Sequence, residues 1–107
     1  MPDFMGLMKQ AAELKTKVEA MQAELERIEV EGTAGGGLVT VKLTAKSEMK
    51  GVRIDPSLLK ADEKEILEDL IVAAHADARR KAEGVLEERM KGLTAGLELP
   101  PGMKLPF

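Results

Sequence analysis

The first 28 residues of this chain place apolar side chains at alternating spacings of three and four, without interruption. The series is Phe4, Leu7, Ala11, Leu14, Val18, Met21, Leu25 and Ile28. This a/d spacing holds one seam of a helix against a partner helix along its whole length, whereas a surface helix of a globular protein usually has a wider apolar face. We therefore predict a helical arm over residues 1–28.

The predicted arm is long for a chain of 107 residues. At 1.5 Å per residue, residues 4–28 span ~37 Å, whereas a compact domain of about 100 residues has a radius of gyration of only ~13 Å. The helix should therefore project beyond the rest of the protein. Two Phe and no Trp or Tyr leave few large side chains for a core, and a small monomer buries a modest share of its surface. We expect a homodimer.

After the arm, the period of the apolar residues changes to two. Val39, Val41 and Leu43 alternate with polar residues, and a glycine-rich stretch interrupts the chain before them at residues 32–37. Period two with β-branched residues is typical of strands, so the pattern predicts three antiparallel strands joined by short turns over residues 29–55. We expect the three apolar residues to lie on a protected surface, at the dimer interface.

Residues 62–91 return to helical spacing and predict a second long helix. Asp62 is the expected N-cap, with Glu65 at the capping-box position. Gly92 marks the end of this helix, and the prolines of residues 94–107 favour an extended tail. The whole chain is thus predicted to form one α+β domain: a long helix, a three-stranded antiparallel sheet, a second long helix and an extended C-terminal tail.

Catalytic chemistry finds little support in this sequence. No cysteine is present, and His75 is the sole histidine, so thiolate chemistry and clusters of Cys or His around zinc are excluded. The glycines of residues 32–37 are followed by Leu38 and Val39 rather than by the Lys-Ser/Thr pair of a phosphate loop. We expect no enzymatic activity, no metal and no cofactor. Since no run of 18 apolar residues and no secretion signal is present, we also expect a cytosolic protein.

The charge distribution is uneven. The formal net charge of −3 argues against a simple polybasic nucleic-acid binder. Residues 32–60, however, carry five basic and two acidic side chains, whereas residues 1–31 carry four and seven. In residues 61–93 acidic side chains crowd the start and basic ones the later part, which also suits the macrodipole of a helix.

Taken together, the elements resemble a known family. The stretches that carry the resemblance are Met8-Lys9-Gln10-Ala11, Gly37-Leu38-Val39, Val52-Arg53-Ile54-Asp55-Pro56-Ser57-Leu58-Leu59, Leu67-Glu68-Asp69-Leu70 with Ala73-Ala74 and Asp77-Ala78, and Leu99-Pro100-Pro101-Gly102 closing on Pro106-Phe107. Each is weak alone, but together and in order they are specific. The chain is similar to the YbaB/EbfC family of bacterial nucleoid-associated proteins. It departs from many relatives at its start, where Pro2 and Asp3 replace a glycine-rich, more basic stretch.

The resemblance implies a tweezer-like homodimer whose long helices project as arms. It also implies binding of double-stranded DNA with little strict sequence requirement, and a role in nucleoid organisation or gene regulation. We therefore expect a cytoplasmic protein associated with the nucleoid. Its expected partners are duplex DNA and a second copy of itself, with no membrane and no small-molecule substrate.

Two groups of basic residues are candidates for contact with DNA. If the two long helices pack antiparallel, the start of the first lies beside the end of the second, and their basic side chains share one arm. These residues are Lys9, Lys15, Lys17, Arg79, Arg80, Lys81, Arg89 and Lys91. The competing group on the predicted strands comprises Lys42, Lys46 and Arg53. Contacts would be mainly to phosphate, because no recognition-helix or zinc-finger pattern is present.

The sequence alone is also compatible with a function in protein binding. The regular a/d seam and the negative net charge also suit a coiled-coil adaptor that binds proteins and not DNA, with the Leu-Pro-Pro-Gly tail as its docking segment. Binding to duplex DNA across a series of salt concentrations separates the two functions.

Overall fold

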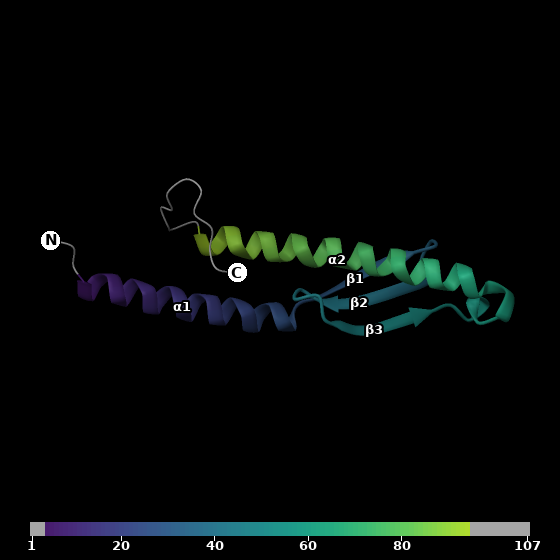
Figure 1. The fold of residues 1–107 in the computed structure, drawn as a ribbon, viewed down its shortest axis with the longest axis horizontal. Coiled ribbons are helices and arrows are strands. Elements are labelled where there is room, and N and C mark those ends of the chain that lie inside the picture. The colour runs from purple at the N-terminus through teal and green to yellow at the C-terminus, as the bar shows by residue number, and fades with distance from the viewer. Residues whose placement is uncertain (1–3, 95–107) are drawn as a thin grey trace.

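The computed structural model describes residues 4–94, and the predicted tail after Thr94 lies outside them. The elements are α1 (Phe4–Arg27), β1 (Glu29–Ala34), β2 (Val39–Thr44), β3 (Met49–Ile54), the short 3-10 helices η1 (Pro56–Leu58) and η2 (Ala61–Glu63), and α2 (Lys64–Thr94). The predicted α+β order of long helix, three-stranded antiparallel sheet and second long helix is confirmed (Figure 1).

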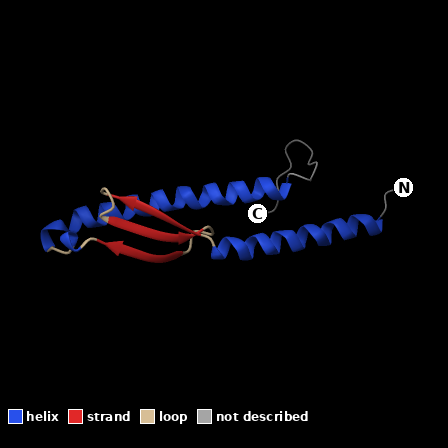
Figure 2. Cartoon of the chain, turned by 180° about the vertical axis from the view of Figure 1, so that it is seen from behind, coloured by secondary structure: helices blue, strands red, loops and turns tan. Residues whose placement is uncertain are grey.

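The molecule is elongated, and its long helices produce this shape. Its principal extents are 73 × 25 × 16 Å, and its radius of gyration is 19.8 Å, against ~13 Å for a compact domain of about 100 residues. α2 runs along the sheet and continues beyond it beside α1, in the opposite direction (Figure 1). Seen from behind, α1 again reaches past the carboxyl end of α2 (Figure 2). The first helix therefore projects as an arm.

The sheet has the strand order β1-β2-β3, so β2 lies in the centre. Val39 pairs with Ala34 of β1 on one side and with Ile54 of β3 on the other. The turn between β1 and β2 begins with three glycines, residues 35–37, whose φ angles of 66°, 68° and 97° lie in the left-handed region that favours glycine. Gly32 belongs to β1 itself. The glycine-rich interruption expected at residues 32–37 is therefore shorter than predicted.

The main core lies between the sheet and α2, which packs on β1 and β2. Val39, Val41 and Leu43 are fully buried there with Ala74 and Ala78. The small side chains of α2 allow this close approach. On the sheet side Gly32 makes it possible, because a Cβ atom at this position would overlap the backbone of Ala74 and Ala78. The register of α2 on the sheet is therefore fixed at a contact between backbones.

A second, smaller core joins the two long helices where they leave the sheet. Met21 and Leu25 of α1 are buried against Ala45, which follows β2. The partly buried apolar residues around them are Ile28, Val85, Leu86, Met90 and Leu93. Within residues 4–94, the α1 seam is thus buried only near its carboxyl end.

The start of α2 differs from the prediction. Asp62 is not its N-cap, because residues 61–63 form η2 and α2 begins at Lys64. The side chain that does cap a helix in this connection is that of Asp55, which accepts a hydrogen bond of 2.9 Å from the backbone N–H of Ser57 in η1. At its other end α2 continues through Gly92 to Thr94.

Candidate nucleic-acid interface

The three lysines of the projecting arm are exposed. Lys9, Lys15 and Lys17 all lie on α1, and none forms an ion pair with another residue of the described range 4–94. Lys9 takes the f position of the heptad, opposite the seam, while Lys15 and Lys17 take the e and g positions beside it. Their ammonium groups are available to an anion without the loss of a partner from this described range.

The arm also carries two basic residues from α2. Arg89 pairs with Glu24 of α1 at 3.0 Å, and Lys91 pairs with Glu87 of its own helix at 3.7 Å. The antiparallel packing of the two helices therefore brings Arg89 beside α1 as expected. Here, however, each basic side chain already has an acidic partner.

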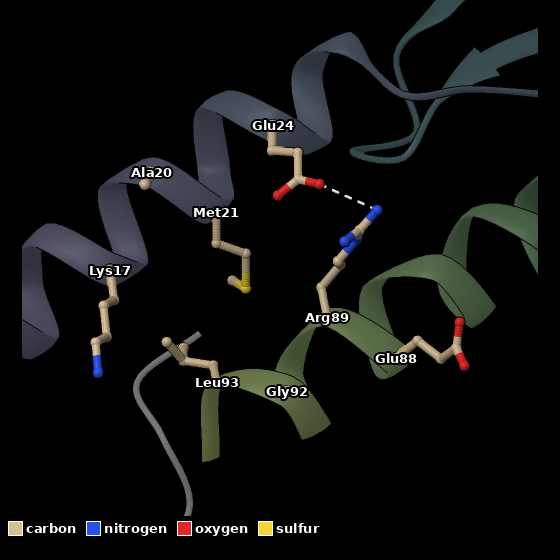
Figure 3. A pocket seen from close by; sticks show the side chains of 8 residues that line it. All are labelled: Lys17, Ala20, Met21, Glu24, Glu88, Arg89, Gly92 and Leu93. Carbon is tan, nitrogen blue, oxygen red and sulfur yellow. Dashed lines mark ion pairs between the residues drawn. The ribbon is translucent and has the colours of Figure 1, made fainter. Parts of the chain in front are cut away.

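A groove of about 360 Å³ lies between the helices at this point. Its lining is Lys17, Ala20, Met21 and Glu24 from α1, with Glu88, Arg89, Gly92 and Leu93 from α2 (Figure 3). The floor is apolar, and the Arg89–Glu24 ion pair crosses from one helix to the other (Figure 3). Sequence reasoning missed Glu24, although its g position beside the seam is where pairs between helices form.

Arg79, Arg80 and Lys81 do not reach the arm. They follow Asp77, whose carboxylate accepts a hydrogen bond of 3.0 Å from the backbone N–H of Thr33 in β1. This part of α2 therefore lies over the sheet. The structure thus separates these three residues from the arm lysines, with which the sequence had grouped them.

Asp77 is the centre of a small charged cluster over β1. Its carboxylate lies 3.4 Å from Arg80 and 3.3 Å from Lys81. Lys81 also donates a hydrogen bond of 2.8 Å to the backbone carbonyl of Glu31. The Thr33 N–H, and after it the hydrogen bond from Lys81, hold the pKa of Asp77 below its usual value. Because Arg79 pairs with Glu83 at 3.2 Å, all three basic residues have acidic partners.

The competing group on the sheet is also mostly paired. Lys46 lies 3.2 Å from Glu26, and Arg53 lies 3.4 Å from Glu31. Lys42 has no ion pair within the described part of the chain. Lys42 and Arg53 alternate with the core residues of their strands, which places them on the sheet face opposite α2.

Val39, Val41 and Leu43 offer no surface to a second copy. Each is completely buried under α2 of its own chain, so their protection needs no partner. The free apolar surface of the sheet region lies instead at β3, which α2 leaves uncovered: Met49 is 50% exposed and Val52 is 38% exposed. The sequence pattern could not reveal this, because it does not show how far across the sheet α2 reaches.

Two other features are absent from the part of the chain that the structure describes. Across residues 4–94, no group of three or more His, Cys, Asp or Glu is placed to hold a metal ion. In the same range, no helix has the length and apolar character needed to cross a membrane.

Comparisons with known proteins agree with this architecture. The model of the YbaB/EbfC DNA-binding family matches residues 1–97. A nucleoid-associated protein of Rhodopseudomonas palustris (strain TIE-1) is 64% identical over 105 residues, which cover 98% of this chain and 99% of that protein. A nucleoid-associated protein of Methylocella silvestris is 62% identical over 107 residues, the full length of both. The crystal structure of the uncharacterized protein HP0035 from Helicobacter pylori matches with a TM-score of 0.77 and 22% identity, covering 87% of this chain and 98% of that one. This last match shows the fold alone.

Proposed function

The chain belongs to the YbaB/EbfC DNA-binding family, and we propose that it binds duplex DNA as a homodimer, largely through contacts to phosphate. Two relatives that match nearly the whole chain carry the name nucleoid-associated protein. We infer the same association for this chain, with a role in nucleoid organisation or gene regulation. The observation that carries the proposal is the set of exposed lysines on the projecting arm that form no ion pair within residues 4–94.

The basic residues differ as candidates for contact with DNA, because some of them already form ion pairs with acidic side chains. An exposed ion pair contributes only about 0–1 kcal/mol, so Arg89 can exchange Glu24 for a phosphate at small cost. The displaced carboxylate, however, stays close and repels the phosphate. Lys9, Lys15 and Lys17 have no ion-paired carboxylate within residues 4–94 to displace, so we place the main DNA contacts on them. Arg89 and Lys91 support these contacts, and Arg79, Arg80 and Lys81 contribute least.

Twofold symmetry completes the proposed binding surface. A homodimer duplicates the arm, and two arms form the sides of a tweezer-like cleft that can straddle a duplex. Six arm lysines in total make few phosphate contacts, so we expect affinity in the nonspecific range of ~10⁻⁴ to 10⁻⁶ M at physiological salt. The net charge of −3 keeps the rest of the surface from adhering to nucleic acid.

We place the homodimer contact in the sheet region, at its uncovered side. β3 is an edge strand, and the exposed apolar side chains of Met49 and Val52 lie on it. Leu59 and Ile66, from the connection to α2 and its first turn, add further exposed apolar surface. An edge strand with apolar neighbours is the kind of surface that a native protein covers.

A gel-shift titration with nonspecific duplex DNA tests this function. The protein should bind at low salt, and the logarithm of its binding constant should fall linearly with the logarithm of the salt concentration. Absence of binding at about 50 mM salt would contradict the proposal and favour the coiled-coil adaptor. A binding constant that does not change with salt would contradict phosphate contact.

A further inference from the structure

The amino-terminal half of the α1 seam is exposed, although its carboxyl-terminal half is buried. Phe4 is 69% exposed and Leu7 is 55% exposed, whereas Leu25 is 1% exposed. The difference follows from the length of α1, which reaches beyond the end of α2 in both views (Figures 1 and 2). Lys17 is the outermost α1 residue in the groove between the helices. Residues 4–14 therefore have no helix of the described chain opposite them.

The exposed half of the seam keeps the geometry required for a helical partner. Phe4, Leu7, Ala11 and Leu14 occupy a, d, a and d positions, in phase with the buried Met21 and Leu25. A strict a/d stripe fits the holes of a facing helix better than a flat surface. The natural occupant is therefore another helix with the same repeat.

A second copy of the same segment fits this requirement. In an antiparallel helix pair, a positions face d positions of the other helix. When two copies are aligned about Lys9, Phe4 meets Leu14 of the second copy, and Leu7 meets Ala11 of the second copy. Both contacts occur at one register, and each occurs twice by symmetry. The segment is thus complementary to itself about a twofold axis.

The residues beside the seam also suit this register. Met8 and Gln10 take the e and g positions closest to the axis, where each would meet its own counterpart, and neither is charged. No like charges are therefore forced together at the centre of the contact. Lys9 takes the f position on the far side of the helix, so its ammonium group stays exposed when the seam is covered.

We propose that residues 4–14 of α1 pair, antiparallel, with the same residues of a second copy, and that this contact joins one homodimer to the next. The joining of dimers rests on the homodimer of the proposed function. Because a chain then has one contact at the sheet and another at the arm, each dimer presents two free arms and can join two further dimers in a row. Lysines on the outer side of the paired arms remain available, so such a row can connect separate stretches of DNA.

The small size of the contact determines its strength. Stable interfaces bury about 1,200–2,000 Å², and four apolar residues from each arm supply much less. The contact is therefore weak and depends on concentration. Dimers held on the same DNA have a high effective concentration, which favours a contact of this kind.

Cysteine cross-linking tests the proposed register, because the chain contains no cysteine. A mixture of Leu7→Cys and Ala11→Cys should form a disulfide between the two variants under mild oxidation, since these positions face each other across the arms. Each variant alone should stay near the level of Val72→Cys, a control on the outside of α2, where Val72 is 71% exposed. Linkage of Ala11→Cys to itself would show parallel arms and overturn the proposal. So would absence of linkage in the mixture, the result expected if residues 95–107 of the same chain cover the seam.

Sedimentation velocity tests the joining of dimers. The unmodified protein should change from dimers to larger species as its concentration rises. The variant Phe4→Gln with Leu7→Gln should remain dimeric, since both substitutions are neutral and Gln is a good helix former. If the cysteine variants cross-link through their arms but the unmodified protein never exceeds the mass of a dimer, the arms are the dimer interface itself, and the joining of dimers is wrong.

A gel shift with the same double variant separates the two proposals. The arm lysines are unchanged, so its salt dependence on a short duplex that accepts one dimer should match that of the unmodified protein. Dimers that lose larger assembly and retain this DNA binding support the inference. If the unmodified protein assembles as expected but fails to bind DNA, the proposed function fails while the arm contact stands.

Discussion

Arg89 of α2 and Glu24 of α1 form an ion pair of 3.0 Å across the two long helices. The pair lies above the small core of Met21, Leu25 and Ala45, where the arm leaves the body of the protein. The guanidinium of Arg89 therefore lies beside the carboxylate of Glu24, which repels a phosphate. The same contact affects both the packing of the arm and the charge that it presents.

We expect Glu24→Gln to strengthen DNA binding. The substitution removes a negative charge beside Arg89 and leaves the guanidinium free for phosphate. The slope of the logarithm of the binding constant against the logarithm of salt concentration should therefore steepen by up to about 0.9 for each further phosphate that the protein neutralises. Because the pair is exposed, the free energy of unfolding should fall by no more than about 1 kcal/mol. Gel shifts and urea unfolding measure the two effects. Glu68→Gln, near the start of α2 and away from the arm, is the control for a general change in charge.

Gly32→Ala should destabilise the protein strongly. The added Cβ atom would overlap the backbone of Ala74 and Ala78, and neither backbone can move without shifting α2 from the sheet. Overpacking of this kind costs about 1–3 kcal/mol. Gly84→Ala is the matched control, since a Cβ atom at this position of α2 would meet nothing within 4 Å beyond its chain neighbours and its own helix backbone, and it should stabilise the helix by about 1 kcal/mol. Urea unfolding at fixed protein concentration should show a lower free energy of unfolding for Gly32→Ala and a higher one for Gly84→Ala.

Asp77 should contribute to stability at neutral pH and lose that contribution in acid. Its pKa is lowered in the folded protein by the Thr33 N–H and by Lys81. A carboxyl whose folded pKa lies below its unfolded value stabilises the protein above the unfolded value, and this contribution is lost as pH falls through the folded pKa. The stability difference between the unmodified protein and Asp77→Asn should therefore shrink as pH falls from about 7 to below about 4. A constant difference would contradict the role of Asp77, and the exposed Asp69→Asn serves as control.

Val52→Asp should dissociate the homodimer. The substitution places a charge in the middle of the apolar surface that α2 leaves open at β3, where Val52 is 38% exposed. Val72→Asp, on the outside of α2, makes the same chemical change away from this surface and should leave the dimer intact. Sedimentation equilibrium measures both. If the unmodified protein sediments only as a species of 11.6 kDa at micromolar concentration, the homodimer itself is wrong.

Local patterns in the sequence were sufficient to predict the elements of the fold. The a/d seam gives α1, and the alternation around Val41 gives β2 with its buried face, because each pattern reflects which side of one element is covered. The burial of Thr44 could not be predicted from this alternation, because it depends on hydrogen bonds in the turn after β2. Its hydroxyl accepts hydrogen bonds from the backbone N–H groups of Lys46 and Glu48, so Thr44 is completely buried although it is one of the polar residues that alternate with Val41 and Leu43.

The arrangement of the candidate site depends on tertiary contacts that no local pattern contains. Arg79 and Arg89 lie on the same helix, but of these two only Arg89 pairs with a residue of α1. The position of each is set by the contact of Gly32 with α2, which fixes how far the helix continues past the sheet. The sequence therefore could not show that Arg79 lies over the sheet while Arg89 lies beside the arm.

The most direct test of the account compares two triple substitutions that remove the same charge. In one, Lys9, Lys15 and Lys17 become Ala; in the other, Arg79, Arg80 and Lys81 become Ala, and helix content should be preserved in both because Ala is the strongest helix former. The quantity to measure is the slope of the logarithm of the DNA binding constant against the logarithm of salt concentration. We expect the arm variant to bind more weakly and its slope to flatten by about 0.9 for each phosphate that it no longer neutralises, while the second variant retains most of its affinity and slope. An unchanged slope for the arm variant together with a flattened slope for the second would show that DNA is held over the sheet and not by the arms.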